Sequence, residues 1–187
     1  ALLSVSQFTA DETNRVFDLQ KQFTIIPNSI DITSFETDKS IAEVPNTVLY
    51  FGSLIRKKGL LELPFIFNEL IGLNPSAKLV LVGKDVPDII SGSPSTWAMM
   101  QPLFLEKALS NVSYLGSVPY QDIQKYISES SVCVFPSFAE ALPVSWIEAM
   151  AMQKAIVASN IGWATDVIDD GVNGFLVNPK NHAEYAS

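Results

Sequence analysis

The sequence predicts an α/β fold built on a Rossmann-like, doubly wound parallel sheet. Short, continuously apolar segments recur along the chain, as strands buried on both faces of a parallel sheet require. Helical patterns separate these segments, and this alternation is typical of βαβ units. Three of the segments end in glycine, at Gly52, Gly83 and Gly116, where the chain must turn at the carboxyl edge of the sheet. Ligands of such sheets bind outside that edge, so we expect a binding site there.

Each predicted strand is a short apolar run with many β-branched or aromatic residues. The six predicted strands are residues 47–52, 78–83, 111–116, 131–135, 155–159 and 174–177. Helices are predicted at about residues 60–72, 95–109, 120–129, 144–152 and 163–169. The Gly-x-Gly-x-x-Gly fingerprint is absent after the first strand, because the next glycine after Gly52 is Gly59. This disfavours a nicotinamide or flavin dehydrogenase.

The amino-terminal segment has a different pattern. A capping box at residues 9–12 predicts a helix that runs to about Lys21. Residues 23–26 resemble a short strand, and residues 27–31 carry a turn signal. Residues 36–45 are polar and unpatterned, as expected of a connector.

We therefore expect two parts. Residues 1–45 would hold the end of a preceding domain and an interdomain linker, and residues 46–187 would form the sheet domain. The chain opens at Ala1 and not at Met, which favours a fragment, and we expect the carboxyl-terminal end to be truncated as well.

Composition and charge exclude several classes of function. The net charge of −8 and the pI near 4.5 disfavour nucleic acid as a partner, because a domain that binds nucleic acid normally carries a basic face. No apolar run is long enough to span a bilayer, and residues 1–20 lack a signal-peptide pattern. We therefore expect a cytoplasmic protein whose membrane association, if any, is peripheral and made through a domain outside this sequence. The chain has one Cys, Cys133, which excludes an internal disulfide. It has one His, His182, and without a second His or a Cys cluster neither a metal site nor a Ser/His triad is expected.

The segment over residues 135–150 carries the most chemical information. A buried strand ends there, a loop follows, and Pro143 stands where a helix would take its first residue. The free amides and the dipole of such a helix start suit an anion such as a diphosphate. Glu140 in the loop and Glu148 in the helix could each accept hydrogen bonds from sugar hydroxyls. Taken alone, the two residues also fit a solvated loop carboxylate and a charge on the helix surface.

This segment resembles a known family. Glu140 and Glu148 are separated by seven residues, with Phe-Pro-Ser ahead of the motif and Ala-Met-Ala after it. The arrangement is similar to the E-x7-E signature of the retaining, nucleotide-sugar-dependent glycosyltransferases of family 4, or group 1, which have the GT-B architecture. Further similar segments follow the order of the family: the interdomain hinge at residues 25–31, the phosphate-binding loop at 49–59, and residues 78–83, 112–119 and 154–177.

The resemblance implies a role for each matching residue. Glu148 would accept hydrogen bonds from the ribose hydroxyls of the donor nucleotide. Glu140 would lie beside the transferred sugar and help to stabilise its developing positive charge, and Lys58 would neutralise the departing diphosphate, so these two are the expected catalytic residues. The other expected contacts of the nucleotide sugar are Gly52, Ser53 and Arg56 in the phosphate loop, the backbone at Ser117 and Val118 near the base, and Ala141, Leu142, Pro143 and Val144 at the helix start, of which Pro143 has no N–H to donate.

The chain departs from the family pattern at several positions. Ser53 stands where the family often has Arg, and Arg56 is the candidate to supply the charge, with a solvated loop cation as the equal alternative. The other departures are Ser29, Gln153, Ala155, Trp163 and Asp166, where the family usually has Gly, Gly, Pro, Gly and Glu. None lies in the central motif, but together they leave the sugar and the base of the donor open.

The resemblance implies the donor-binding, carboxyl-terminal domain of a retaining glycosyltransferase. Such an enzyme moves a hexosyl group from a nucleoside diphosphate sugar to an acceptor, in polysaccharide or glycolipid biosynthesis. We expect the acceptor to bind an amino-terminal domain outside this sequence, the fragment alone to be inactive, and neither a metal nor another cofactor to be needed. The alternative is a nucleotide-sugar-binding module without catalytic activity. An epimerase or a pyridoxal-dependent phosphorylase on the same fold is not supported by the residues present.

Overall fold

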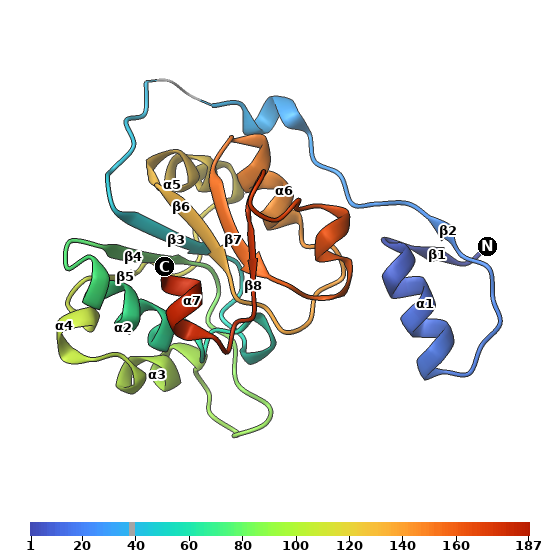
Figure 1. The fold of residues 1–187 in the computed structure, drawn as a ribbon, viewed down its shortest axis with the longest axis horizontal. Coiled ribbons are helices and arrows are strands. Elements are labelled where there is room, and N and C mark those ends of the chain that lie inside the picture. Colours follow the sequence, from blue (N-terminus) through green and yellow to red (C-terminus); the bar gives the residue numbers. More distant parts are fainter. Residues whose placement is uncertain (38–39) are drawn as a thin grey trace.

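The structure, a computed structural model, describes residues 1–37 and 40–187. Its centre is a six-stranded sheet in which every neighbouring pair of strands is parallel, in the order β5-β4-β3-β6-β7-β8 (Figure 1). The strands are β3 (Thr47–Phe51), β4 (Lys78–Val82), β5 (Val112–Tyr114), β6 (Val132–Phe135), β7 (Ala155–Ser159) and β8 (Phe175–Val177). The predicted α/β fold with a parallel sheet is confirmed, and each strand falls within a predicted range.

The strand order reverses next to β3. The chain runs from β3 outward to β4 and β5, then returns to place β6, β7 and β8 on the other side of β3. The carboxyl ends of β3 and β6 therefore face a crevice from which the flanking connections diverge, which is where open α/β sheets bind ligands. All five residues of β3 are buried, as expected of a central strand covered on both faces.

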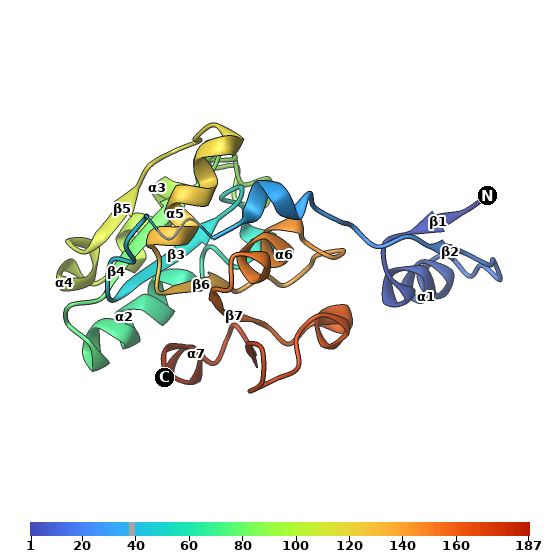
Figure 2. The ribbon, with the colours of Figure 1, turned by 90° about the horizontal axis from the view of Figure 1, so that it is seen from above.

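Helices cover both faces of the sheet (Figures 1 and 2). α2 and α7 lie together on one face, whereas α5 and α6 lie on the other. The helices of this domain are α2 (Leu63–Leu73), α3 (Thr96–Met100), α4 (Glu106–Leu109), α5 (Ile123–Glu129), α6 (Val144–Ala151) and α7 (His182–Ala186). Short 3₁₀ helices are η2 (Arg56–Lys58), η3 (Gln101–Leu103), η4 (Tyr120–Asp122) and η5 (Gly162–Asp166). None of the helices formed by the described residues is both long and apolar enough to cross a membrane.

Three of the predicted helices have a different form, and the one predicted over residues 120–129 is the 3₁₀ helix η4 followed by α5. The single helix predicted over residues 95–109 is divided into α3, η3 and α4, because Pro102 lies within it and a proline cannot continue an α-helix. The helix predicted over residues 163–169 is the 3₁₀ helix η5 instead. α7 was not predicted.

The amino-terminal segment forms a small unit beside the large sheet (Figure 1). β1 (Leu3–Ser4) pairs in parallel with β2 (Thr24–Ile25), and α1 (Gln7–Val16) connects them and contacts η5. The predicted capping box at Thr9 is wrong: the N-cap is Ser6, whose hydroxyl accepts a hydrogen bond from the Thr9 amide at 3.1 Å. α1 also ends at Val16, before the predicted Lys21.

The connection between the two parts returns to the sheet domain through a 3₁₀ helix, η1 (Ile32–Phe35). η1 contacts α6, and the Phe35 side chain at its end is 2% exposed. The predicted turn over residues 27–31 is irregular, and within it the Asn28 amide reaches the sheet domain, donating to the Leu142 carbonyl at 2.7 Å. The connector predicted over residues 36–45 includes residues 38–39, which lie outside the described residues.

Candidate functional site

A cleft of about 420 Å³ lies at the carboxyl ends of β3 and β4, beside the start of α6. Its position is the crevice that the strand order predicts. The residues that line it are Phe51, Gly52, Ser53, Lys58, Val82, Gly83, Lys84, Ser117, Val118, Tyr120, Ile123, Glu140, Pro143, Val144, Ser145 and Glu148.

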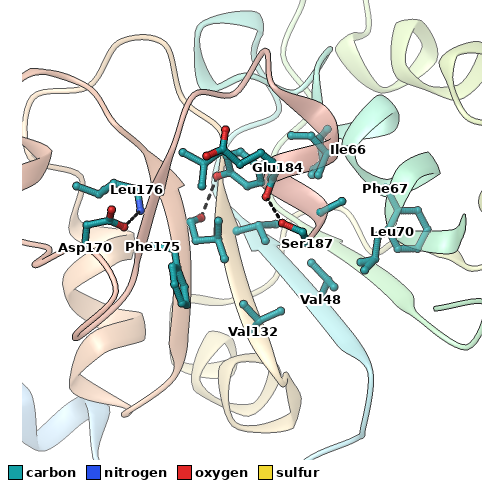
Figure 3. A pocket seen from close by; sticks show the side chains of 16 residues that line it. Val48, Ile66, Phe67, Leu70, Val132, Asp170, Phe175, Leu176, Glu184 and Ser187 are labelled. Atoms are coloured by element: carbon teal, nitrogen blue, oxygen red, sulfur yellow. Dashed lines mark hydrogen bonds between the residues drawn. The ribbon is translucent and has the colours of Figure 1, made fainter. Parts of the chain in front are cut away.

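A larger cavity, of about 520 Å³, has different chemistry (Figure 3). It lies between α2, α7 and the sheet, and most of its lining is aliphatic or aromatic. Two carboxylates reach its rim, and one of them, Asp170, already accepts a hydrogen bond from the Leu176 amide at 2.9 Å. Among the described residues, no lysine or arginine lines this cavity, so these residues offer an anionic ligand no counter-charge. We therefore place the candidate site in the smaller cleft.

Two glycines let the strand ends that form the floor of the cleft approach each other. Gly52 and Gly83 have φ values of 140° and 148°, a region that side chains rarely adopt. A Cβ atom on Gly83 would lie 1.9 Å from the Gly52 carbonyl oxygen. The floor of the cleft is therefore open backbone, which a ligand can approach closely.

The start of α6 forms one wall of the cleft. Val144 is the first helical residue, as the predicted range 144–152 has it, whereas Pro143 is the N-cap and not the first residue of the helix. Leu142, just before it, has a φ of 65°, a left-handed conformation that is costly for a leucine. The hydrogen bond from Asn28 to the Leu142 carbonyl helps to hold that conformation. The connection from the amino-terminal unit thus supports the loop that delivers α6 to the cleft.

Glu148 lies in the second turn of α6 and points into the cleft, with only 4% of its surface exposed. The hydroxyl of Tyr120, in η4, donates a hydrogen bond to Glu148 Oε1 at 2.5 Å. Burial raises the pKa of the Glu148 carboxyl, and the hydrogen bond from Tyr120 partly opposes that change. Burial, together with the same bond, raises the pKa of Tyr120 to about 12. The alternative that Glu148 is a charge on the helix surface is therefore wrong.

Glu140 and Lys58 form an ion pair at the other end of the cleft. Lys58 Nζ lies 3.2 Å from Glu140 Oε1, and the Ser137 hydroxyl lies 3.3 Å from the same oxygen. Lys58 lies in the 3₁₀ helix η2, which ends at Gly59, and Gly59 has a left-handed conformation. A Cβ atom on Gly59 would lie 1.8 Å from the Pro136 carbonyl oxygen. The phosphate-loop segment and the loop after β6 are thus packed together, which brings the two charged groups into contact.

Trp163 supports the loop that carries Glu140. Its indole N–H donates a hydrogen bond to the Glu140 carbonyl oxygen at 2.7 Å. Its ring packs on that of Trp146, in α6, with ring centroids 4.9 Å apart, and both side chains are 1% exposed. A residue that departs from the family pattern therefore holds the backbone of a central residue.

Arg56 does not reach the cleft. Its guanidinium makes two hydrogen bonds with the Asp88 carboxylate, at 2.8 and 2.7 Å. These bonds, with others from Ser91, hold the pKa of Asp88 well below its usual range. Arg56, one of the expected contacts of the nucleotide sugar, is therefore not among the residues that line the cleft, and it is an ion-pair partner of Asp88 and not a solvated loop cation. Lys84, which was not singled out from the sequence, lines the cleft together with Lys58.

Most of the residues expected from the sequence meet in this one cleft. Those that line it are Gly52, Ser53, Lys58, Ser117, Val118, Glu140, Pro143, Val144 and Glu148. Ala141 and Leu142 do not line it. The Leu142 side chain is buried in the hydrophobic core. Tyr120 is the main residue that was missed. Its place directly after the segment expected to meet the base was the available signal. Among residues 1–37 and 40–187, no group of three or more His, Cys, Asp or Glu side chains is placed to hold a metal ion.

The fold and the sequence both match glycosyltransferases. The α-maltose-1-phosphate synthase of Mycolicibacterium smegmatis is 32% identical over 134 residues, which are 70% of this chain and 33% of that protein. The lipopolysaccharide 1,2-N-acetylglucosaminetransferase of Salmonella typhimurium is 29% identical over 147 residues, 76% of this chain and 38% of its own length. The structure of HepE from Anabaena in complex with UDP superposes with a TM-score of 0.80 at 23% identity, over 98% of this chain and 51% of that one.

The chain thus spans between a third and about half of the length of these relatives. The model of the family described as "Glycosyl transferases group 1" matches residues 31–187, which include the whole six-stranded sheet and every residue of the cleft. This chain therefore belongs to the group 1 glycosyltransferase family.

Proposed function

We propose that this chain is the donor-binding, carboxyl-terminal domain of a retaining GT-B glycosyltransferase and that its cleft holds a nucleoside diphosphate sugar. The observation that carries the proposal is the meeting of Glu148, Glu140 and Lys58 in one cleft at the start of α6. The complex of HepE with UDP supports it, since that protein shares the fold.

The cleft offers a partner to each part of such a donor. Buried Glu148 would accept hydrogen bonds from the ribose hydroxyls. Lys58, Lys84 and the free amides at the start of α6 would bind the diphosphate, as the positive end of a helix dipole favours an anion. The backbone near Ser117 and Val118 would meet the base.

Lys58 and Glu140 are placed to act on the bond that breaks. As the bond between the sugar and the diphosphate opens, negative charge grows on the leaving diphosphate and positive charge grows on the sugar. A fixed cation at Lys58 stabilises the first, and the Glu140 carboxylate stabilises the second. In this structure these two groups pair with each other, and the donor would insert its charges between them.

The acceptor would be bound by an amino-terminal domain outside this sequence. We infer this from the share of the relatives' length that the chain spans. Because orientation of both reactants supplies much of such catalysis, the isolated 187 residues should bind donor but transfer no sugar. Synthesis of a polysaccharide or a glycolipid is the proposed process, supported by the name of the Salmonella relative. The second candidate, a binding module without catalysis, differs in one result: the longer protein would bind donor and never turn it over.

Calorimetric titration of the chain with UDP, and then with a panel of nucleoside diphosphate sugars, tests the proposal. Binding should persist in EDTA, since Lys58 and the helix start provide the counter-charge for the diphosphate. Lys57→Ala is a matched control for Lys58→Ala, because Lys57 is adjacent and does not line the cleft. The absence of binding to any nucleoside diphosphate, or binding only with added manganese or magnesium, would contradict the proposal.

A further inference from the structure

Tyr120 closes off the carboxylate that the proposed function assigns to ribose. Its hydroxyl lies 2.5 Å from Glu148 Oε1, and Glu148 as a whole is only 4% exposed. A ribose hydroxyl and a phenol hydroxyl are the same kind of hydrogen-bond donor. In this structure Tyr120 therefore occupies a position on Glu148 Oε1 that a ribose hydroxyl could also take.

The Tyr120 side chain is held loosely enough to leave. It is 63% exposed, and it lies on the short 3₁₀ helix η4. Its ring meets Phe35 edge-on, with centroids 5.8 Å apart. By contrast, Tyr50 and Tyr185 are 1% and 5% exposed and donate to backbone carbonyls, as expected of structural tyrosines.

A buried carboxylate needs such a partner. Burial already raises the pKa of Glu148, and a buried charge without a hydrogen bond is costly. Tyr120 satisfies Glu148 until a ligand with the same donor chemistry arrives. A ligand that lacks ribose hydroxyls can offer Glu148 nothing in exchange and gains nothing by displacing it.

We propose that Tyr120 is a displaceable cap on Glu148, which a ribose hydroxyl must displace on binding, so that the cap lowers the affinity of the cleft for ribonucleotides. This inference rests on the proposed function, since it assumes that Glu148 receives the ribose. It predicts an unusual sign: removing the Tyr120 hydroxyl should improve binding, because the ribose no longer competes with an internal hydrogen bond.

The test compares the wild type with Tyr120→Phe by calorimetry, using UDP and 2′,3′-dideoxyuridine diphosphate. Tyr120→Phe should bind UDP about two- to tenfold more tightly, the range expected for one competing hydrogen bond. Its affinity for the dideoxy ligand should equal that of the wild type. Tyr185→Phe is the matched control, because it also removes a phenol hydroxyl but lies outside the cleft, and it should change neither affinity.

Other results would overturn the inference. Weaker UDP binding by Tyr120→Phe would mean that the hydroxyl positions Glu148 for the ligand. Unchanged UDP binding would mean that the hydroxyl does not compete with the ribose for Glu148. Equal tightening for both ligands would show that the effect does not depend on ribose. If the wild type binds UDP, and Glu148→Gln weakens that binding while Tyr120→Phe does not strengthen it, only the cap is refuted. If the wild type binds no nucleoside diphosphate, the proposed function and the cap both fall.

Discussion

The two carboxylates of the motif should respond to the same substitution in different ways. Glu148→Gln and Glu140→Gln each replace a charge with a neutral amide of the same shape. Glu148 is proposed to meet the ribose, which nucleoside diphosphate and full donor both carry, so both ligands should lose affinity equally. Glu140 is proposed to meet the sugar, so its substitution should leave nucleoside diphosphate affinity within about threefold and reduce turnover by the longer protein.

The contacts of Glu148 set the size of the expected loss. A hydrogen bond to a charged group contributes about 1.5–3 kcal/mol, which corresponds to roughly 10- to 150-fold in affinity. The substitution also removes the charge assistance from the hydrogen bond that Tyr120 donates to Oε1. Because the free protein and the complex are both weakened, the net loss for Glu148→Gln should lie near the lower end, at about tenfold.

Calorimetry on both variants, with UDP and with the preferred nucleotide sugar, measures these values. Equal loss of UDP affinity in the two variants would mean that their roles are assigned wrongly. No loss in either would remove the motif from the site.

Glu148 also makes the stability of the domain depend on pH. Burial raises its pKa in the folded state above the ordinary value of a glutamate, so the folded protein holds this proton to higher pH than the unfolded chain does. Stability from this group is fully present below the unfolded pKa and is lost as the pH rises through the folded pKa. The unfolding free energy of the wild type should therefore fall relative to that of Glu148→Gln as the pH rises from about 4.5. Thermal melts of both proteins at several pH values would show this fall. A constant difference would mean that the carboxyl is not desolvated.

Three further predictions follow from the geometry around the cleft. Lys58→Ala should weaken UDP binding about tenfold and uridine binding little, since only UDP carries the diphosphate, whereas Lys57→Ala should change neither. Arg56→Ala should leave UDP affinity within about twofold, because its guanidinium is bound to Asp88, while hydrogen exchange in the loop over residues 88–93 should increase. Gly83→Ala should prevent folding or cost several kcal/mol, as its Cβ would lie 1.9 Å from a backbone oxygen, and failure of the variant to lose stability in a denaturant titration would contradict this packing.

The positions of the strands along the chain and their parallel arrangement were predictable from the sequence. Continuous apolar runs such as those of β3 and β4 occur where both faces of a strand are covered, so local composition carries that information. The same holds for the family motif, because the spacing of Glu140 and Glu148 and the start of α6 are local features. The position of the cleft followed from the general rule for open parallel sheets.

Local signals misjudged features that depend on competition or on distant contacts. Thr9 fits a capping box, yet Ser6 stands three residues earlier and provides the cap. Pro102 divided a helix that periodicity extended across it. Arg56 lies in the expected phosphate-loop segment of the sequence, but its guanidinium donates hydrogen bonds to Asp88, thirty-two residues away along the chain.

The sequence by itself determined the fold class, the family and most of the residues that line the cleft, because these depend on patterns within one segment or on the order of segments. Only the tertiary structure decided the burial and the hydrogen-bond partners of the two carboxylates. It buried Glu148 and set Tyr120 on it from a segment twenty-eight positions away, paired Glu140 with Lys58, and placed Trp163 behind the Glu140 backbone. These choices depend on burial and on which donor reaches which acceptor. Both arise only when separate segments pack together, since desolvation and hydrogen bonding act through space and not along the chain.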